Sequence, residues 1–343
     1  FGQGLEELAE KLVNALELTQ VQRLGVSGHV QVSELVVRVV GGVIARQPTT
    51  FVQQALNGLQ LGFMYAMIAV GYTLVYGVVK LINFAYGDIF MVGAFVSFFG
   101  ITQYGFSFVP ALLLATIACV FLAVVIDRVA YKPLRDAPRI AALITALGMS
   151  IFLEYFTALK FVFSADYIAF ERPFELVSWE VGGIRFTNIQ LIVAGVSILY
   201  FLGVQYVVGR TKIGKAMRAS AFDKATARLM GINVNAVIGA TFALTGALAG
   251  TAAMLYATAY PQIFTFMGIQ PGLKAFVAAV IGGIGSIPGA FVGSLIMGFT
   301  EAMTVGFVPY GSTLKDGVAF ILLIAMLLIR PTGIFGDPFE EIK

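Results

Sequence analysis

The sequence has 343 residues, of which 59% are hydrophobic and only 12% are charged, and its mean hydropathy is +0.89. Soluble domains carry about 25% charged residues, so this chain has too little polar surface to cover itself in water. Its formal net charge of +3 is small and does not indicate a nucleic-acid partner. With one cysteine and one histidine, the chain excludes disulfide frameworks, cysteine zinc sites and catalytic triads that use histidine.

Residues 1–50 differ from the rest of the chain. Apolar residues recur at helical spacing between Leu5 and Leu16 with glutamates on the other side, which predicts an amphipathic helix. Residues 33–45 are apolar but too short and too charged to span a membrane. We expect residues 1–50 to be an extension on the extracytoplasmic side or on the membrane surface. The chain does not begin with Met, which indicates a processed or incompletely represented start.

Apolar runs of about 20 residues follow one another over residues 51–335, which is the length of a membrane-crossing helix. The runs are continuous rather than alternating, so they predict helices and not a β-barrel. We expect an all-α, polytopic membrane helix bundle of about 8–10 transmembrane segments, two of them broken, followed by a cytoplasmic tail at 336–343. The expected segments are 56–79, 81–100, 108–126, 140–163, 189–208, 236–257, 290–307 and 318–329, with a short, glycine-broken one at 274–285.

The stretch from Gly209 to Asn233 carries six basic residues against a single acid, Asp223. Lys and Arg in short loops stay on the cytoplasmic side, so this loop is expected to be cytoplasmic. The connection 127–139 is also basic, whereas 164–186 is acidic and should lie outside. Counting segments then places the N-terminus outside and the C-terminus in the cytoplasm.

Glycines recur four residues apart in three places: Gly58-xxx-Gly62, Gly246-xxx-Gly250 and Gly285-xxx-Gly289-xxx-Gly293. Residues at this spacing share one helix face, and small residues there let backbones approach closely, which is how helices associate in lipid. We expect these faces to pack against other helices. The alternative is that such thin faces also leave room for a pathway.

Polar residues and glycines interrupt two of the apolar segments. Non-helical backbone at membrane depth survives only where it is buried in protein or lines a watery cavity, and discontinuous helices mark transporter sites near the midplane. We therefore expect a substrate pathway lined by residues of these breaks and by one intramembrane acid: Asn83, Tyr86, Asp88, Gly283, Gly285, Ser286 and Glu301.

Charges within spans are functional candidates because each costs at least about 2.5–3.5 kcal/mol unless it is paired or hydrated. For Asp88, Glu154 and Glu301, a structural hydrogen bond to a neighbouring helix is the alternative to a transport role. Three lysines lie near segment ends, where their long side chains are expected to reach the water interface: Lys80, Lys160 and Lys274.

Residues 209–216 resemble the phosphate-binding pattern GxxxxGK[ST]. The last position is Ala216, so the hydroxyl that would bind Mg²⁺ is missing, and a membrane span precedes the segment instead of a β-strand. We expect no ATP, metal or other cofactor site in this chain.

Four ordered blocks carry a resemblance to a known family: 58–98 with INFAYGD, 128–153 with YKPLRDAPR, 213–233 with KAMRASAFDKATARLMGIN, and 272–303 with VIGGIGSIPGAFVG. The chain resembles the permease subunit of branched-chain amino acid ABC importers, most closely the smaller of the two paired permeases, over roughly residues 51–335. The resemblance implies a non-catalytic subunit of a bacterial plasma (inner) membrane.

The resemblance also implies the chain's partners. They are a second permease that completes a heterodimer, two cytoplasmic subunits that bind ATP and Mg, and an extracytoplasmic protein that delivers leucine, isoleucine, valine or a related amino acid. In such importers a cytoplasmic coupling helix docks into the ATPase. Here that helix is expected within 213–231, with these residues at the docking surface: Lys215, Arg218, Asp223, Ala225, Ala227 and Gly231.

The chain departs from the family pattern where members commonly have His and Glu, because it has Tyr86 and Asp88. Urea and short-amide permeases share the same core and are an alternative, although Phe84 favours amino acids. A second alternative is an ion-coupled secondary transporter that uses Asp88, Glu154 or Glu301. The large basic loop favours the importer, since a secondary transporter needs no docking surface.

Overall fold

The computed structural model describes residues 48–135 and 137–336. The chain divides into residues 1–52 and residues 53–343, and the second unit contains the helical bundle. The expected amphipathic extension lies almost wholly outside the described residues, as does the C-terminal tail from residue 337. The boundaries expected at residues 50 and 335 therefore stay predictions.

Within the described residues, seven helices are long and apolar enough to cross a membrane. They are α4 (Pro48–Val79), α6 (Phe108–Ile126), α7 (Arg139–Thr157), α8 (Asn188–Arg210), α11 (Val234–Ala259), α13 (Ile287–Phe307) and α14 (Gly311–Ile329). Two shorter apolar helices, α5 (Tyr86–Thr102) and α12 (Ile269–Gly282), belong to the segments expected to be broken. The expected all-α membrane bundle is confirmed.

Some helix ends differ from the sequence expectation. The helix that begins with α6 continues beyond Ile126 through a π-helical turn, η1 (Asp127–Tyr131), and a 3-10 turn, η2 (Lys132–Leu134). The segment expected to reach residue 163 ends at Thr157, because the Phe163 N–H bonds back to the Thr157 carbonyl (3.1 Å) and turns the chain.

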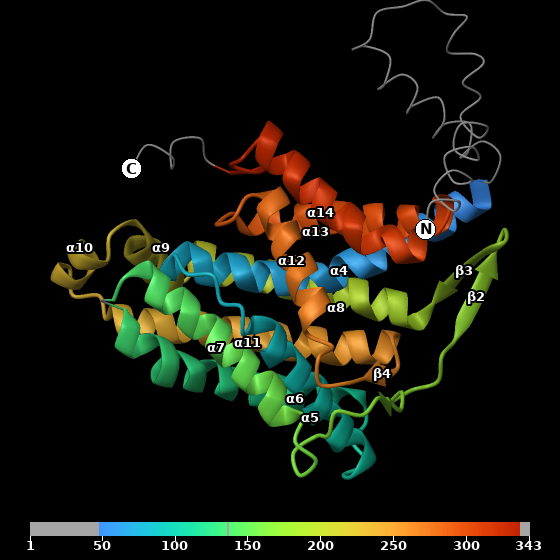
Figure 1. Cartoon of the computed structure of the whole chain (residues 1–343), viewed down its shortest axis with the longest axis horizontal. Coiled ribbons are helices and arrows are strands. Elements are labelled where there is room, and N and C mark those ends of the chain that lie inside the picture. The colour runs from blue at the N-terminus through green and yellow to red at the C-terminus, as the bar shows by residue number, and fades with distance from the viewer. Residues whose placement is uncertain (1–47, 136, 337–343) are drawn as a thin grey trace, which may run out of the picture. The chain divides into compact units, whose positions relative to one another are not determined.

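The two ends of the bundle carry different structures, as Figure 1 shows. At one end lie the helices of the basic loop, α9 (Lys212–Phe222) and α10 (Lys224–Leu229). At the other end, residues 164–186, expected only to be hydrophilic, contribute most of a hairpin of β2 (Ser178–Val181) and β3 (Ile184–Thr187). They also contain β1 (Ile168–Ala169), which pairs antiparallel with β4 (Gln262–Ile263) beyond α11.

Glycines bring α6 and α11 into backbone contact. A Cβ atom built on Gly250 would lie 2.6 Å from the Ala115 carbonyl oxygen, and one built on Gly246 would lie 2.5 Å from the Cys119 carbonyl oxygen. No side chain larger than hydrogen fits at such distances, so the packing role expected for this glycine pair is confirmed. Cys119 is buried in the same contact.

The first glycine pair performs the same task between α4 and α13. A Cβ atom on Gly58 would lie 2.8 Å from the Cα atom of Phe299, and one on Gly62 would lie 2.9 Å from the Cα atom of Leu295. On the partner helix α13, Gly298 faces Gly58 and Gly62 and belongs to the same contact. The expectation that the Gly58–Gly62 face packs against another helix is therefore confirmed.

The third glycine run is only partly a packing face. A Cβ atom on Gly293 would lie 2.7 Å from the Gly282 nitrogen, and one on Gly289 would lie 3.0 Å from the Gly282 carbonyl carbon, so both residues pack on α12. The expectation is wrong for Gly285, because a Cβ atom built there has no atom of the described residues within 4 Å. The reason is that α13 begins only at Ile287, and Gly285 lies in the break with a φ of 102°.

We predict that Gly250→Val destabilises the bundle by about 1–3 kcal/mol, the usual cost of overpacking, because the new side chain meets the α6 backbone. The measurement is thermal or denaturant unfolding of the purified chain in detergent. Gly195→Val in α8 is the matched control, because no atom in the described part of the chain lies within 4 Å of a Cβ built there. Equal losses of stability in the two variants would contradict the packing account.

Candidate functional site

The two breaks in the helices, far apart in the sequence, lie side by side in the structure. Ile82 of the first break and Ile284 of the second line the same cavity, together with Tyr72, Tyr76, Phe276 and Ala279. At the start of the short helices, a Cβ atom on Gly87 would lie 2.6 Å from the Gly268 carbonyl oxygen. The segments that the sequence indicates as a possible pathway therefore form one junction.

This junction is closed within the single chain. The cavity between the breaks has a volume of about 10 Å³, whereas ligand pockets have volumes of about 300–1,000 Å³. Aromatic rings close the space, with the Phe84 and Phe276 centroids 6.3 Å apart and those of Tyr72 and Phe276 6.0 Å apart. An amino acid does not fit at this point of the described chain without a rearrangement.

Asn83 and Asp88 are both buried and both hydrogen-bonded to distant elements. The Asn83 Oδ1 atom accepts a bond of 2.5 Å from the Tyr131 hydroxyl of η1, and the Asp88 Oδ2 atom accepts one of 2.5 Å from the Ser150 hydroxyl of α7. The Asn83 amide nitrogen is buried without a hydrogen-bond partner among the described residues. The first break is thus tied to η1 and α7 by polar contacts that the sequence does not indicate.

Tyr86 is directed into the bundle. Its hydroxyl donates a hydrogen bond of 2.9 Å to the Thr245 carbonyl of α11, and its ring packs edge to face on Tyr72 with centroids 5.0 Å apart. The hydroxyl occupies the space that a side chain at Gly71 would need. In this conformation Tyr86 acts as a packing residue between α4 and α11.

The second break is held by the segment after α14. The N–H groups of Ile334 and Phe335 donate hydrogen bonds of 2.9 Å to the Ile281 and Gly282 carbonyls, which end α12. Gly283 has a φ of 105°, a conformation that favours glycine. These bonds satisfy two of the carbonyl groups that every helix C-terminus leaves without partners.

Ser286 and Gly285 differ in role. The Ser286 hydroxyl accepts a hydrogen bond of 3.2 Å from the Gly289 N–H and caps the start of α13, whereas Gly285 is exposed. Ser286 is therefore an N-cap, a position that favours serine.

Glu301 forms a buried ion pair with Lys274, and two partly exposed charges, Lys315 and Asp316, extend it into a network that joins four helices. Its carboxylate accepts hydrogen bonds from Lys274 of α12 (2.6 Å) and from the Tyr65 hydroxyl of α4 (3.0 Å). The Lys274 ammonium also lies 2.6 Å from a carboxylate oxygen of Asp316 in α14, and the Lys315 ammonium lies 3.9 Å from Glu301. The two positive and two negative charges balance, so neither Lys274 nor Glu301 is left as an unpaired buried charge.

The structure corrects the expectation that Lys274 reaches the water interface. Its side chain is only 6% exposed, because Glu301 and Asp316 supply partners inside the bundle. The sequence shows the lysine within an apolar run but gives no sign that both acids face it from other helices. Lys160, by contrast, is exposed.

The basic loop forms two helices, not one continuous helix over 213–231. Thr211 caps α9 by accepting a hydrogen bond of 3.1 Å from the Gly214 N–H. At Asp223 the chain is extended, and the carboxylate caps α10 by accepting from the Ala225 N–H (2.8 Å) and the Thr226 hydroxyl. These bonds hold the pKa of Asp223 below its ordinary value, and the bond from the Thr226 hydroxyl has the largest effect.

Gly231 ends α10 in the way its sequence position indicates. It has a φ of 81°, and the Ile232 N–H returns to the Ala227 carbonyl over 3.0 Å, a bond typical of a glycine-terminated helix. Ala227 is buried, whereas Lys215 and Ala225 are exposed. Arg218 is also exposed, but its guanidinium donates to the Val208 carbonyl and so holds α9 against the end of α8.

The tip of the loop exposes large apolar side chains that the sequence argument overlooked. Phe222, Leu229 and Met230 are 83%, 87% and 78% exposed. Exposed large apolar residues on an otherwise charged loop are typical of interaction surfaces, so this apolar tip, formed by Phe222, Leu229 and Met230, is a candidate docking surface. The signal was present in the sequence as three large apolar residues within a basic stretch.

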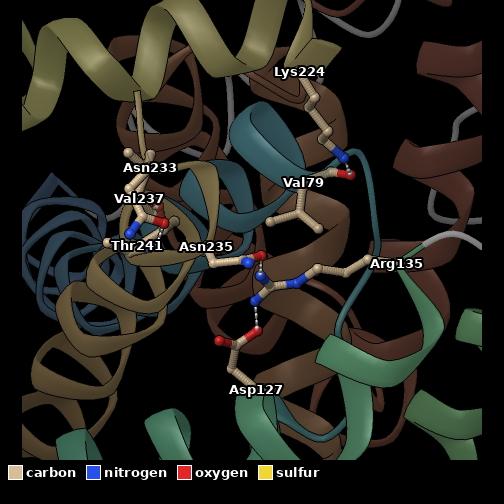
Figure 2. A network of polar contacts seen from close by, with 9 residues as sticks. Val79, Asp127, Arg135, Lys224, Asn233, Asn235, Val237 and Thr241 are labelled. Carbon is tan, nitrogen blue, oxygen red and sulfur yellow. Dashed lines mark hydrogen bonds and ion pairs between the residues drawn. The ribbon is translucent and has the colours of Figure 1, made fainter. Parts of the chain in front are cut away.

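Polar contacts connect the loop to the first break, as Figure 2 shows. The Lys224 ammonium of α10 donates a hydrogen bond of 3.0 Å to the carbonyl of Val79, the last residue of α4 before the break. Nearby, Arg135 forms an ion pair of 2.6 Å with Asp127 and also donates to the Asn235 side chain at the start of α11. These contacts join α10 to the end of α4, and Arg135 to Asp127 and to the start of α11.

Comparison with known proteins decides the family. A family model described as "Branched-chain amino acid transport system / permease component" matches residues 54–327. The chain belongs to this family. It is 42% identical to the high-affinity branched-chain amino acid transport system permease protein BraD of Pseudomonas aeruginosa, over 85% of this chain and 97% of that protein.

Two further relatives share almost their whole length with the chain. The high-affinity permease protein LivH of Escherichia coli is 40% identical, over 85% of this chain and 97% of LivH. A probable LivH permease of Methanocaldococcus jannaschii is 29% identical, over 82% and 91%. As a member of this permease family, the chain is a non-catalytic, multi-pass membrane protein.

We predict that Lys274→Met destabilises the bundle by about 3–5 kcal/mol, the usual cost of removing one partner of a buried ion pair, because Glu301 and Asp316 lose their shared cation. Unfolding of the purified chain measures the effect. Lys160→Met, at an exposed lysine, is the control and should change little. If the two variants unfold alike, the charge network does not stabilise the fold.

Proposed function

We propose that this chain is the transmembrane permease subunit of an ATP-driven importer for branched-chain or related amino acids. The observation that carries the proposal is the match to the family over residues 54–327, with relatives whose names state branched-chain amino acid transport. These relatives favour amino acids over the urea or short-amide alternative.

The translocation pathway is proposed to form between this chain and a second permease. The closed junction of the breaks supports a shared pathway, because its cavity of about 10 Å³ is far too small for an amino acid. Asn83 and Asp88 remain the proposed pathway residues at the first break, and Gly283, Gly285 and Ser286 those at the second. Tyr86 and Glu301 would then act by holding helices in place.

The apolar tip is proposed to dock on a cytoplasmic ATP-binding subunit. Three exposed apolar side chains provide the contact, and the basic residues around them include Lys215, Arg218 and Lys224. The proposed complex contains two such subunits, which bind ATP and Mg, and an extracytoplasmic protein that delivers the substrate. This chain itself is proposed to hold no cofactor.

The proposed orientation follows from the basic loop. Lys and Arg in short connections favour the cytoplasm, so the α9–α10 end faces inward and the β2–β3 hairpin faces outward. The N-terminus is then extracytoplasmic, the C-terminus is cytoplasmic, and the membrane is the bacterial inner membrane.

We predict that Leu229→Ser with Met230→Ser uncouples the importer. Truncation of apolar side chains at the centre of an interface reduces the binding free energy by about 1–2 kcal/mol, so the affinity for the ATPase should fall about tenfold. Both side chains are exposed, so the variant should still insert into the membrane. The measurement is substrate-stimulated ATP hydrolysis and leucine uptake by the reconstituted complex.

Leu176→Ser is the matched control, because Leu176 is also an exposed apolar residue but lies in the connection between α7 and α8, at the opposite end of the bundle. Coupled hydrolysis that is unchanged in the double variant would contradict the docking proposal. If proteoliposomes with this chain alone accumulate leucine under an ion gradient, the secondary-transporter alternative is correct and the importer proposal fails.

A further inference from the structure

The β2–β3 hairpin has one apolar face and one polar face. The register pairs Trp179 with Phe186 and Val181 with Ile184, which places these four side chains on one face of the ribbon. The other face carries the Ser178–Thr187 and Glu180–Arg185 pairs. Glu180 and Arg185 lie 3.7 Å apart and compensate each other's charge. The sequence already shows this alternation, but it does not reveal what the apolar face contacts.

The apolar face is only partly covered by the chain itself. Trp179 is 48% exposed and Val181 is 66% exposed, whereas Phe186 and Ile184 are half-buried. A face of four apolar residues is small for a protein partner, because stable protein interfaces use about 20–30 residues a side. Its size therefore favours a surface that does not need a large matched area.

The hairpin is held firmly in this position. The Gln53 side chain of α4 accepts from the Arg185 N–H (2.8 Å) and donates to the Arg185 carbonyl (3.2 Å), as a neighbouring strand would. At the base of the hairpin, the Asn188 side-chain amide donates to the Glu175 carbonyl (2.9 Å). The backbone N–H of Asn188 donates to the Val177 carbonyl (3.0 Å). The apolar face is thus presented on a fixed support.

Chain connectivity places the hairpin at the end of a membrane-crossing helix. β3 ends at Thr187 and α8 begins at Asn188, with no connecting residue, and Thr187 and Gln190 form a reciprocal helix cap. α8 itself exposes apolar side chains such as Leu191 and Leu199. Phe186 precedes α8 by two residues, so the Trp179–Phe186 pair lies close to the end of a helix long and apolar enough to cross a membrane.

Other connections at this end of the bundle expose aromatic rings as well. They include Tyr104 between α5 and α6, Tyr167 between α7 and α8, and Tyr310 between α13 and α14, which are 69%, 66% and 72% exposed. Tyr and Trp gather at membrane–water interfaces, where the ring meets apolar chains and the polar atom meets water. The hairpin continues this series of aromatic residues.

We propose that the apolar face of the β2–β3 hairpin lies on the lipid surface of the membrane, with Trp179 at the level of the headgroups and the first acyl carbons. The polar face, with Glu180 and Arg185, then faces water. This inference requires only that the chain is a multi-pass membrane protein, and it does not depend on the substrate or on the ATPase.

Trp179 is the only tryptophan in the chain, so its fluorescence tests the proposal directly. The full chain is reconstituted in phosphatidylcholine vesicles with or without bromine atoms on the acyl carbons nearest the ester. We expect blue-shifted emission, loss of emission in the brominated vesicles and weak quenching by iodide in the water. Equal emission in both kinds of vesicle would overturn the proposal, because bromine quenches only a ring in contact with lipid.

The matched control moves the tryptophan to the polar face through Trp179→Phe combined with Glu180→Trp. This variant should be quenched by iodide and not by brominated lipid. If it does not insert, Trp179→Phe with Arg185→Trp reports on the same face. Shielding of Trp179 from iodide without quenching by bromine would mean that protein covers the apolar face, and that result would also overturn the proposal.

Discussion

Backbone contact between helices at glycine is the interaction on which the rest of this structure depends. Lipid chains are as apolar as the side chains of the helices, so helix association needs close packing instead of a hydrophobic drive. Gly58 and Gly62 supply that contact between α4 and α13, and Gly246 and Gly250 supply it between α6 and α11. The first break follows α4 and the second precedes α13, so the contact between these two helices helps to bring the breaks together.

The breaks lie toward the α9–α10 end of the bundle, and other parts of the chain satisfy most of their backbone and polar groups. Tyr131 bonds to Asn83, and the segment after α14 bonds to the end of α12. The Lys274–Glu301 pair is buried at a further meeting point of the helices. At the end of α4, the Lys224 contact to Val79 connects the first break to α10. In the proposed importer, this contact relays motion of the docked ATPase to the pathway.

The sequence predicts the apolar helices, the two breaks and the basic loop well, because those features depend on local composition and spacing. It fails where a partner comes from a distant segment. Lys274 looks like an interfacial lysine until Glu301 and Asp316 are placed beside it. Asp223 is visible as a single acid, but only the extended backbone at that residue shows that it divides the loop into two helices. The proposed pathway residues Asn83 and Asp88 are a further case, because their partners, Tyr131 and Ser150, come from segments distant in the sequence.

The central claim is that the α9–α10 loop projects into the cytoplasm, where an ATPase can reach its apolar tip. Cys119 is the only cysteine and is buried, so Leu229→Cys with Cys119→Ala gives a single accessible thiol. A membrane-impermeant maleimide should label this thiol in inside-out vesicles and not in intact cells, whereas Glu180→Cys, on the polar face of the hairpin, should show the reverse in the same background. Labelling of Leu229→Cys in intact cells would contradict the account.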